Sequence, residues 1–192
     1  MDKVLGIGNA LVDIMTRLKD DQFLNTYDLP KGSMQLVDQE FVKQLTEATR
    51  DMDKQQASGG SAANTIHGLA RLGADTGFIG KVGNDELGDF FRRDMEKAGI
   101  KPKLFRSSTD SGRAIAMVTP DSERTFATFL GAAIELSPDE LTPQLFEDYQ
   151  YLHIEGYLIQ DQELMKRAFD LARKNGMKVS LDLASFNVVE AN

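Results

Sequence analysis

Two polar side chains follow the first apolar stretch of the sequence at a spacing that suits ligand binding. The segment VLGIG at 4–8 predicts a short strand and a tight glycine turn, and Asn9 and Asp13 come directly afterwards. In open α/β sheets, ligands bind at the carboxyl ends of the strands. An ionised carboxylate only accepts hydrogen bonds, and its two oxygens can receive two neighbouring hydroxyls. Asn9 and Asp13 therefore predict a site for a sugar diol, and the simpler interpretation is an Asx turn beside a surface Asp13.

The same glycine turn also resembles the start of a dinucleotide-binding fingerprint. That fingerprint needs a third glycine and a helix that begins at once, so that the helix N-terminus meets the pyrophosphate. Leu11 stands where the third glycine belongs, and the residues after Gly8 favour extended chain. An NAD-dependent oxidoreductase is therefore the least favoured alternative.

A second glycine segment, SGGSAAN at 58–64, predicts a loop that leads into a helix. Gly59 and Gly60 allow the backbone to approach a ligand closely, and the helix behind them presents free N–H groups. We expect Ser61 to cap this helix and Asn64 to face the same ligand. No Gly-Lys-Ser/Thr follows, so the segment is not a P-loop, and a flexible linker before a capped helix is the simpler interpretation.

Two further acids, Glu155 and Asp182, stand near the ends of two later predicted strands. With Asp13 they would meet at one edge of a parallel sheet, where clustered acids can bind hydroxyls, hold magnesium or act as a base. For Asp182 an ordinary surface position is a strong alternative. The two histidines, His67 and His153, have no partner spacing between them, and we assign neither to a site.

Composition limits the classes of function. The 192-residue chain has a net charge of −8, which argues against nucleic acid and anionic membranes as main partners. It contains no cysteine, which excludes disulfides and cysteine-based zinc sites. No signal peptide or transmembrane-length apolar stretch is visible, and we expect a cytoplasmic protein that binds no metal through this chain.

Periodicity predicts an α/β protein with a separate small sheet. Apolar spacing and caps predict helices at 38–49, with Asp38 as N-cap, and at 84–98, with Asn84 as N-cap. A Ser137–Glu140 capping box opens another helical segment. Two β-rich runs across 113–130 predict a hairpin, which we expect to pair with part of 14–37. Strands at 151–158 and 178–183, with a helix between them, predict a parallel crossover.

Taken in order, the quoted segments resemble the ribokinase-like (PfkB-type) sugar and nucleoside kinases. The match includes GIGNALVD, SGGSAANTIHGLARLGADTGFIGKVGNDELGDFF, GRAIAMVTPDSERTFATFLGAA and LHIEGYL. GNALVDI and LPKGSMQLVD are more similar to adenosine kinases than to ribokinase. The resemblance implies a three-layer α/β core with a mostly parallel sheet, at 1–13, 38–101 and 131–192, and a β-sheet lid at 14–37 and 102–130.

The resemblance also implies roles for individual residues. The residues that would hold the acceptor hydroxyls are Asn9, Asp13, Gly59, Gly60 and Asn64. Met34 and the strand around Ala116 would cover the acceptor, and Glu155 would lie at the edge of the site.

One motif of that family is missing from this sequence. The Gly-Ala-Gly-Asp segment, which supplies the catalytic base, does not occur, because GAA at 131–133 continues as Ile-Glu. The expected last strand also has little sequence after it to cover it. We therefore expect the catalytic residue, and most of the site for ATP and Mg²⁺, downstream of Asn192, so that this portion alone is inactive. A non-catalytic sugar- or nucleoside-binding protein is the alternative, and a homodimer through the lid is possible.

Overall fold

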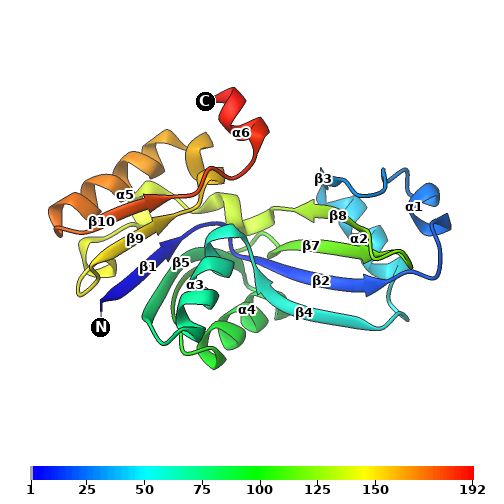
Figure 1. Ribbon diagram of the computed structural model, residues 1–192, viewed down its shortest axis with the longest axis horizontal. Coiled ribbons are helices and arrows are strands. Elements are labelled where there is room, and N and C mark those ends of the chain that lie inside the picture. The colour runs from blue at the N-terminus through cyan, green and yellow to red at the C-terminus, as the bar shows by residue number, and fades with distance from the viewer. Residues whose placement is uncertain (1) are drawn as a thin grey trace.

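The computed structural model describes residues 2–192 and contains two five-stranded sheets that lie end to end (Figure 1). The first has the strand order β10-β9-β1-β5-β6 and is parallel throughout. Its strands are β1 (Lys3–Ile7), β5 (Asp75–Gly83), β6 (Lys101–Ser107), β9 (Tyr151–Ile154) and β10 (Lys178–Leu181). We call it the core sheet.

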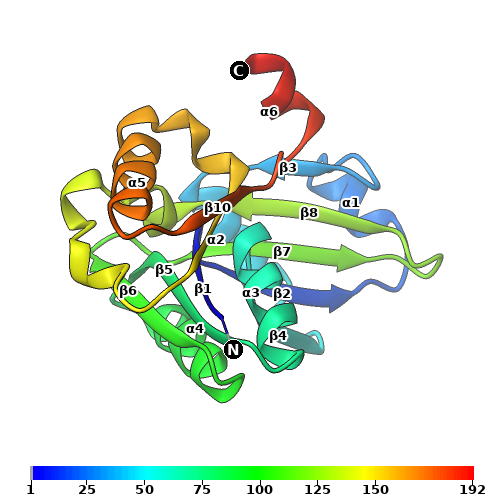
Figure 2. The same cartoon turned by 60° about the vertical axis from the view of Figure 1, so that its left-hand side comes forward.

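Helices cover the core sheet on both faces, which gives the expected three layers (Figure 2). One face of β1 and β5 packs on α5, and the other face packs on α3 and α4. The helices of the chain are α1 (Gln22–Thr26), α2 (Gln39–Ala48), α3 (Ser61–Arg71), α4 (Glu86–Lys97), α5 (Gln162–Lys174) and α6 (Phe186–Ala191). Because parallel strands are buried on both faces, this arrangement explains why most residues of β1 and β5 are apolar or glycine.

The second sheet has the order β3-β8-β7-β2-β4 and is mixed. Its strands are β2 (Leu11–Arg17), β3 (Met34–Leu36), β4 (Lys54–Gly59), β7 (Gly112–Val118) and β8 (Arg124–Phe129). We call it the lid sheet. The expected hairpin at 113–130 and its pairing with part of 14–37 are both confirmed.

Two strands that the sequence did not predict lie across the border that we expected between core and lid. β4 falls within the range assigned to the core, but it pairs with β2 in the lid sheet. β6 falls within the range assigned to the lid, but it pairs with β5 in the core sheet. Both are edge strands with polar or proline-containing sequences, and edge strands need little apolar patterning and tolerate proline.

Several element ends also differ from the sequence-based expectation. Asp85, and not Asn84, caps α4, because its carboxylate accepts from the Gly88 N–H. β9 ends at Ile154 instead of continuing to 158, and a 3₁₀ turn, Gly156–Gln160, follows it. Two 3₁₀ turns, Pro138–Glu140 and Pro143–Leu145, occupy the segment where a helix was expected, although the Ser137–Glu140 capping box is present. A further 3₁₀ turn, Gly131–Glu135, precedes them.

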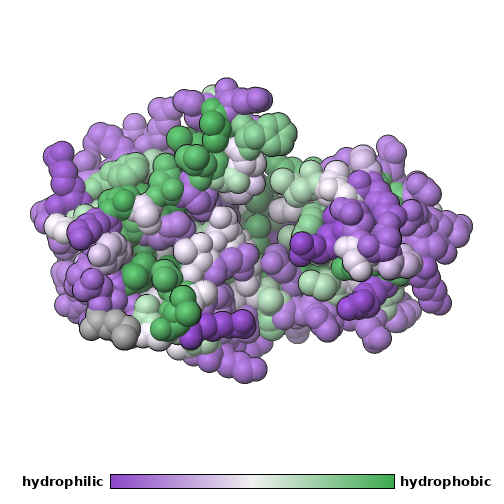
Figure 3. Space-filling view, in the orientation of Figure 1, coloured by the Kyte–Doolittle hydropathy of each residue, from purple (hydrophilic) through white to green (hydrophobic). Residues whose placement is uncertain are grey.

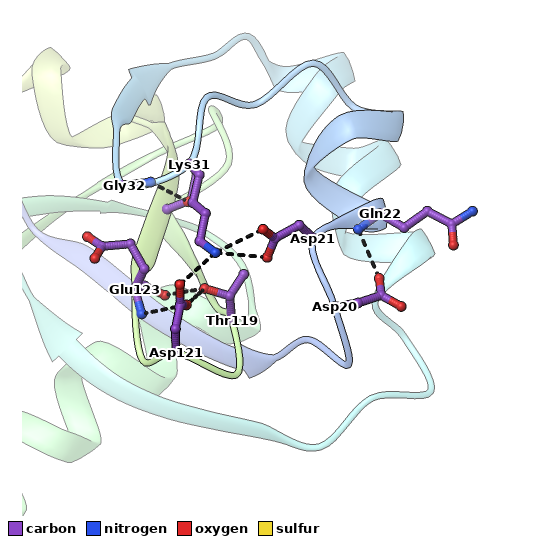
Figure 4. A network of polar contacts seen from close by, with 9 residues as sticks. Asp20, Asp21, Gln22, Lys31, Gly32, Thr119, Asp121 and Glu123 are labelled. Carbon is purple, nitrogen blue, oxygen red and sulfur yellow. Dashed lines mark hydrogen bonds and ion pairs between the residues drawn. The ribbon is translucent and has the colours of Figure 1, made fainter.

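At the far end of the lid sheet, Lys31 fastens three segments together (Figure 4). Its ammonium group lies 2.9 Å from Asp21 Oδ2, just before α1, and 2.7 Å from Asp121 Oδ2, in the turn between β7 and β8. The next residue, Gly32, donates its N–H to Thr125 Oγ1 at 2.9 Å. These contacts hold the chain that enters β3 against the hairpin.

Candidate functional site

The chain passes from the core sheet to the lid sheet through three residues, 8–10, between β1 and β2. β1 and β2 are inner strands of their sheets, so this link lies at the centre of the molecule. Asn9 lies in it and is buried, with 5% of its surface exposed. Its side-chain Nδ2 donates to Glu155 Oε1 at 2.6 Å, and its Oδ1 has no hydrogen-bond partner among the described residues. A buried amide oxygen without a donor is an unsatisfied hydrogen-bond acceptor.

Glu155 joins three elements at this point. It follows β9, is 1% exposed, and accepts from the Asn9 backbone N–H at 3.3 Å as well as from its side chain. Its other oxygen accepts from the Ala62 N–H, in the first turn of α3, at 3.2 Å. Burial raises the pKa of Glu155, and the hydrogen bonds from Ala62 and Asn9 oppose that rise. Glu155 therefore fixes the link and the start of α3 relative to each other.

The glycine pair lies where the backbone comes closest to these groups. Gly60 precedes α3 with φ of +103°, and a Cβ there would lie 2.3 Å from the Asn9 carbonyl oxygen. A Cβ on Gly59 would lie 2.3 Å from Asp13 Oδ2. Only glycine leaves room for both approaches.

The expected cap at Ser61 is wrong, because Gly60 occupies the N-cap position of α3. The Ser61 hydroxyl instead donates to Asp182 Oδ2 at 2.6 Å. That carboxylate also accepts the N–H groups of Gly156 and Ala184 through Oδ1. Asp182 is thus a partner of the backbone around the site and not a free surface acid.

Asp13 is half-buried over Gly59, and its carboxylate has no hydrogen-bond donor within residues 2–192. Burial raises its pKa to about 6. Structural carboxylates are normally hydrogen-bonded when they are removed from water. An unpaired one beside a glycine backbone is suited to accept hydrogen bonds from a bound hydroxyl compound.

Asp13 shares one face of the lid sheet with two other expected site residues. The strand registers pair Asp13 with Ala114, Ala116 with Phe126, and Phe126 with Met34. Residues that are paired directly across two strands lie on the same face of a sheet, and so do residues two positions apart along one strand. We call this side, opposite to α2, the open face of the lid. Met34 is 51% exposed there, whereas Ala116 is 3% exposed.

Asn64 is exposed in the first turn of α3, and its backbone N–H donates to the Gly60 carbonyl at 2.9 Å.

The expected acidic cluster of Asp13, Glu155 and Asp182 is only partly formed. Glu155 and Asp182 meet around the start of α3, through Ala62 and Ser61 respectively. In the described part of the chain, no three His, Asp or Glu side chains are arranged to hold a metal ion.

Sequence reasoning missed one set of contacts near the glycine pair. Ser58, directly before Gly59, contacts both His67 and Asp94. These residues lie on β4, α3 and α4, and no local motif signals that they would meet. An apolar-to-polar alternation in β4 would have indicated the strand, but its sequence, KQQASG, has no such alternation.

The site as a whole offers hydrogen-bond acceptors and close backbone approach, and its carboxylates would repel an anion. A sequence model of the family described as pfkB family carbohydrate kinase matches residues 32–188. The chain belongs to this family. The fold class expected from the sequence, a ribokinase-like core with a β-sheet lid, is therefore confirmed.

Individual pfkB-family proteins support the assignment. The chain is 38% identical over 104 residues to a fructokinase from Klebsiella pneumoniae, which covers 52% of this chain and 33% of that protein. It superposes on a probable sugar kinase from Rhizobium etli CFN 42 with a TM-score of 0.85 at 33% identity, over 99% of this chain and 58% of that one. An adenosine kinase from Sinorhizobium meliloti gives a TM-score of 0.84 at 33% identity, over 99% of this chain and 59% of that one. The chain thus spans between a third and three fifths of the length of these relatives.

Proposed function

We propose that the protein containing this chain transfers the γ-phosphoryl group of ATP to a hydroxyl of a sugar or nucleoside, and that this chain provides the acceptor-binding half and the lid. The observation that carries the proposal is the unpaired carboxylate of Asp13, held against Gly59 at the junction of the two sheets. The membership in a family of carbohydrate kinases and the similarity to sugar and adenosine kinases support it.

In this proposal, Asp13 accepts hydrogen bonds from two acceptor hydroxyls. Asn9 Oδ1, which has no partner among the described residues, accepts a further one. Gly59 and Gly60 allow the sugar ring to lie against the backbone, and Asn64 reaches it from the first turn of α3. Phosphoryl transfer depends mainly on positioning and on charge stabilisation, and these residues perform the positioning of the acceptor.

The open face of the lid would exclude water from the acceptor. Met34 and Met15 are exposed there, beside the small side chain of Ala116. Exposed large apolar side chains on a sheet face are suited to cover a ring. Glu155 would lie at the edge of the site and hold Asn9 in place.

The catalytic base and the groups that bind ATP and Mg²⁺ would lie outside this chain. Neither the Gly-Ala-Gly-Asp segment nor a metal-ligand cluster occurs in residues 2–192. When bound, ATP supplies the phosphoryl group and Mg²⁺ neutralises its charge. An apolar surface at Leu183, Phe186 and Val189 is exposed at the C-terminal end (Figure 3), and it supports the proposal that further chain packs there.

A coupled ADP-release assay tests the proposed activity. The full-length protein should phosphorylate at least one member of a panel of sugars and nucleosides, whereas the 192-residue chain should release no ADP above background. Calorimetric binding of an acceptor by the full-length protein without turnover would favour the non-catalytic binding protein instead. Robust turnover by the 192-residue chain would refute the division of roles.

The proposal extends to the cellular location of the protein and to its assembly as a homodimer. No helix in residues 2–192 is long and apolar enough to span a membrane, and cytoplasmic location stays a prediction. β3 and β4 are the outer strands of the lid sheet, and unpaired strand edges can join two copies. Light scattering of the full-length protein, with a proline substitution at Leu36 as the disrupting variant, tests a homodimer through the lid.

A further inference from the structure

Ser58 lies at the centre of a polar cluster that joins the lid sheet to two helices of the core. Its hydroxyl lies 2.6 Å from Asp94 Oδ2 on α4 and 2.6 Å from His67 Nε2 on α3. Its backbone N–H donates to the same Asp94 oxygen at 2.9 Å. Ser58 is 4% exposed, so water does not compete for these bonds.

The chemistry of the three groups fixes the direction of each bond. A serine hydroxyl has one proton, and an ionised carboxylate can only accept. The Ser58 hydroxyl therefore donates to Asp94 and accepts from His67, which carries its proton on Nε2. In a hydrolytic triad the serine proton goes to the imidazole, so this serine, whose proton goes to a carboxylate, is not an activated nucleophile. The role of the cluster is to position the backbone.

The charge states of Asp94 and His67 agree with this direction of the hydrogen bonds. Burial acts to raise the pKa of Asp94, but the hydrogen bonds from Ser58 and the nearby His67 outweigh it and lower the pKa overall. Burial lowers the pKa of His67, and the attraction of Asp94 opposes that shift. At neutral pH the cluster consists of a carboxylate, a hydroxyl and a neutral imidazole.

The cluster stands next to the backbone that the acceptor site uses. Ser58 directly precedes Gly59, and Gly59 lies under the Asp13 carboxylate. Among the described residues, β4 is an edge strand of the lid sheet and pairs with β2, with Val12 opposite Ser58. Asp94 takes the Ser58 N–H on the side of β4 where no strand of residues 2–192 lies. Because glycine has no side chain to anchor it, the position of Gly59 depends on its neighbours.

We propose that Asp94, acting through Ser58 and supported by His67, is a positioning residue that holds Gly59 and Gly60 in the geometry that binds the acceptor. This inference rests on the proposed kinase function. Asp94 does not touch the acceptor, and its effect passes through the Ser58 backbone. Removing it frees the end of β4 and weakens acceptor binding.

The test compares Asp94→Ala, Asp94→Asn and Ser58→Ala in the full-length protein, with Glu96→Ala, an exposed position on the same helix, as control. Asp94→Ala should raise the acceptor KM roughly tenfold and change kcat less, because two charge-assisted hydrogen bonds are lost. Asp94→Asn should give a smaller increase, since its amide oxygen still accepts both bonds without the charge. The Ser58→Ala/Asp94→Ala double variant should resemble Asp94→Ala, because the two act as one unit.

Hydrogen exchange of the segment 57–62 provides a readout that does not depend on activity. Faster exchange there in Asp94→Ala, but not in Glu96→Ala, supports the positioning role even if no acceptor is phosphorylated, in which case only the proposed function fails. Unchanged exchange and unchanged acceptor KM in both Asp94→Ala and Ser58→Ala would overturn the inference. If Asp94→Ala does not fold, Asp94→Asn decides, because it weakens the bond from the Ser58 N–H, which Ser58→Ala leaves in place; unchanged exchange and acceptor KM in Asp94→Asn would then overturn the inference.

Discussion

Asp13 combines partial burial with an absence of hydrogen-bond donors in the described chain, which raises its pKa to about 6. Only the ionised form accepts hydrogen bonds through both oxygens. We therefore expect the acceptor KM of the full-length protein to be constant above pH 7 and to rise as the pH falls through about 6. Initial rates measured from about pH 5 to about pH 8 check this. In Asp13→Asn the KM should be at least roughly tenfold higher and independent of pH, and a flat profile in the unsubstituted protein would contradict the prediction.

The same carboxylate should reduce the stability of the free protein. Its folded-state pKa is higher than its unfolded value of 3.8, so its contribution is most favourable below that value and is lost as the pH rises through about 6. Asp13→Asn should therefore raise the Tm at pH 7.5 by a few degrees and leave it nearly unchanged near pH 4. Calorimetric scans at both pH values measure the difference, and an equal shift at both would point to packing instead of charge.

Gly60 and Gly68 differ in whether the structure leaves room for a Cβ atom, so alanine substitutions at the two positions should have opposite effects on stability. Gly60 has φ of +103° and no space for a Cβ, whereas Gly68, inside α3, has open space around it. Gly60→Ala should lower the free energy of unfolding by about 2 kcal/mol or more, and Gly68→Ala should raise it by about 0.5–1 kcal/mol. Chemical denaturation of both variants measures these changes. Tolerance of alanine at both positions would contradict the close approach of Gly60 to Asn9.

At the scale of elements, Glu155 connects β9, the β1–β2 link and α3 through one buried carboxylate. Glu155→Ala leaves the Asn9 amide and the Ala62 N–H without their acceptor, which should cost about 3–5 kcal/mol. Glu155→Gln keeps one acceptor oxygen and should cost less. Urea denaturation of the two variants distinguishes them, and equal losses would show that packing volume, not hydrogen bonding, sets the role of Glu155.

Lys31 connects elements at the surface of the lid, where ion pairs contribute little. Its partners Asp21 and Asp121 have side chains that are 49% and 60% exposed. Lys31→Met should therefore lower the Tm by no more than about 4 °C, and the difference should shrink further at about 0.5 M salt. The neighbouring Lys19→Met, at an exposed position without an ion pair in the described chain, is the control. A large loss in Lys31→Met only would show that the segment before β3 depends on this contact.

The sequence predicted those helices and strands whose own residues show a cap, a turn or regular apolar spacing. Asp38 caps α2, the hairpin β7–β8 forms, and α5 follows its apolar spacing, as the sequence indicates. β4 was missed because an edge strand can be polar. The cap at Ser61 was wrong because a distant carboxylate, Asp182, takes its hydroxyl. Tertiary partners far apart in sequence override local preferences at such positions.

At the scale of the whole molecule, the sequence predicted the two-sheet architecture but not the border between the sheets. The border depends on pairings of β4 with β2 and of β6 with β5, and pairing between distant strands leaves no periodic signal. Asn9 and Asp13 could be singled out as candidate site residues because strand ends and glycine turns are local, and their roles stay predictions. The contacts that hold them, through Glu155 and Gly59, required the fold.

The position of β1 in the core sheet has a consequence for biosynthesis. β1 lies between β5 and β9, which begin at Asp75 and Tyr151, so it needs a neighbour from each of two segments that are synthesised after it. At ordinary synthesis rates of about 5–20 residues per second, it waits on the order of ten seconds for the second one. During that time β1 has β5 on one side, and β2 has β4 and β7 as neighbours, but the edge of β1 that will pair with β9 stays open. An open strand edge can pair with another chain, and slow translation between β5 and β9 would keep this edge open longest.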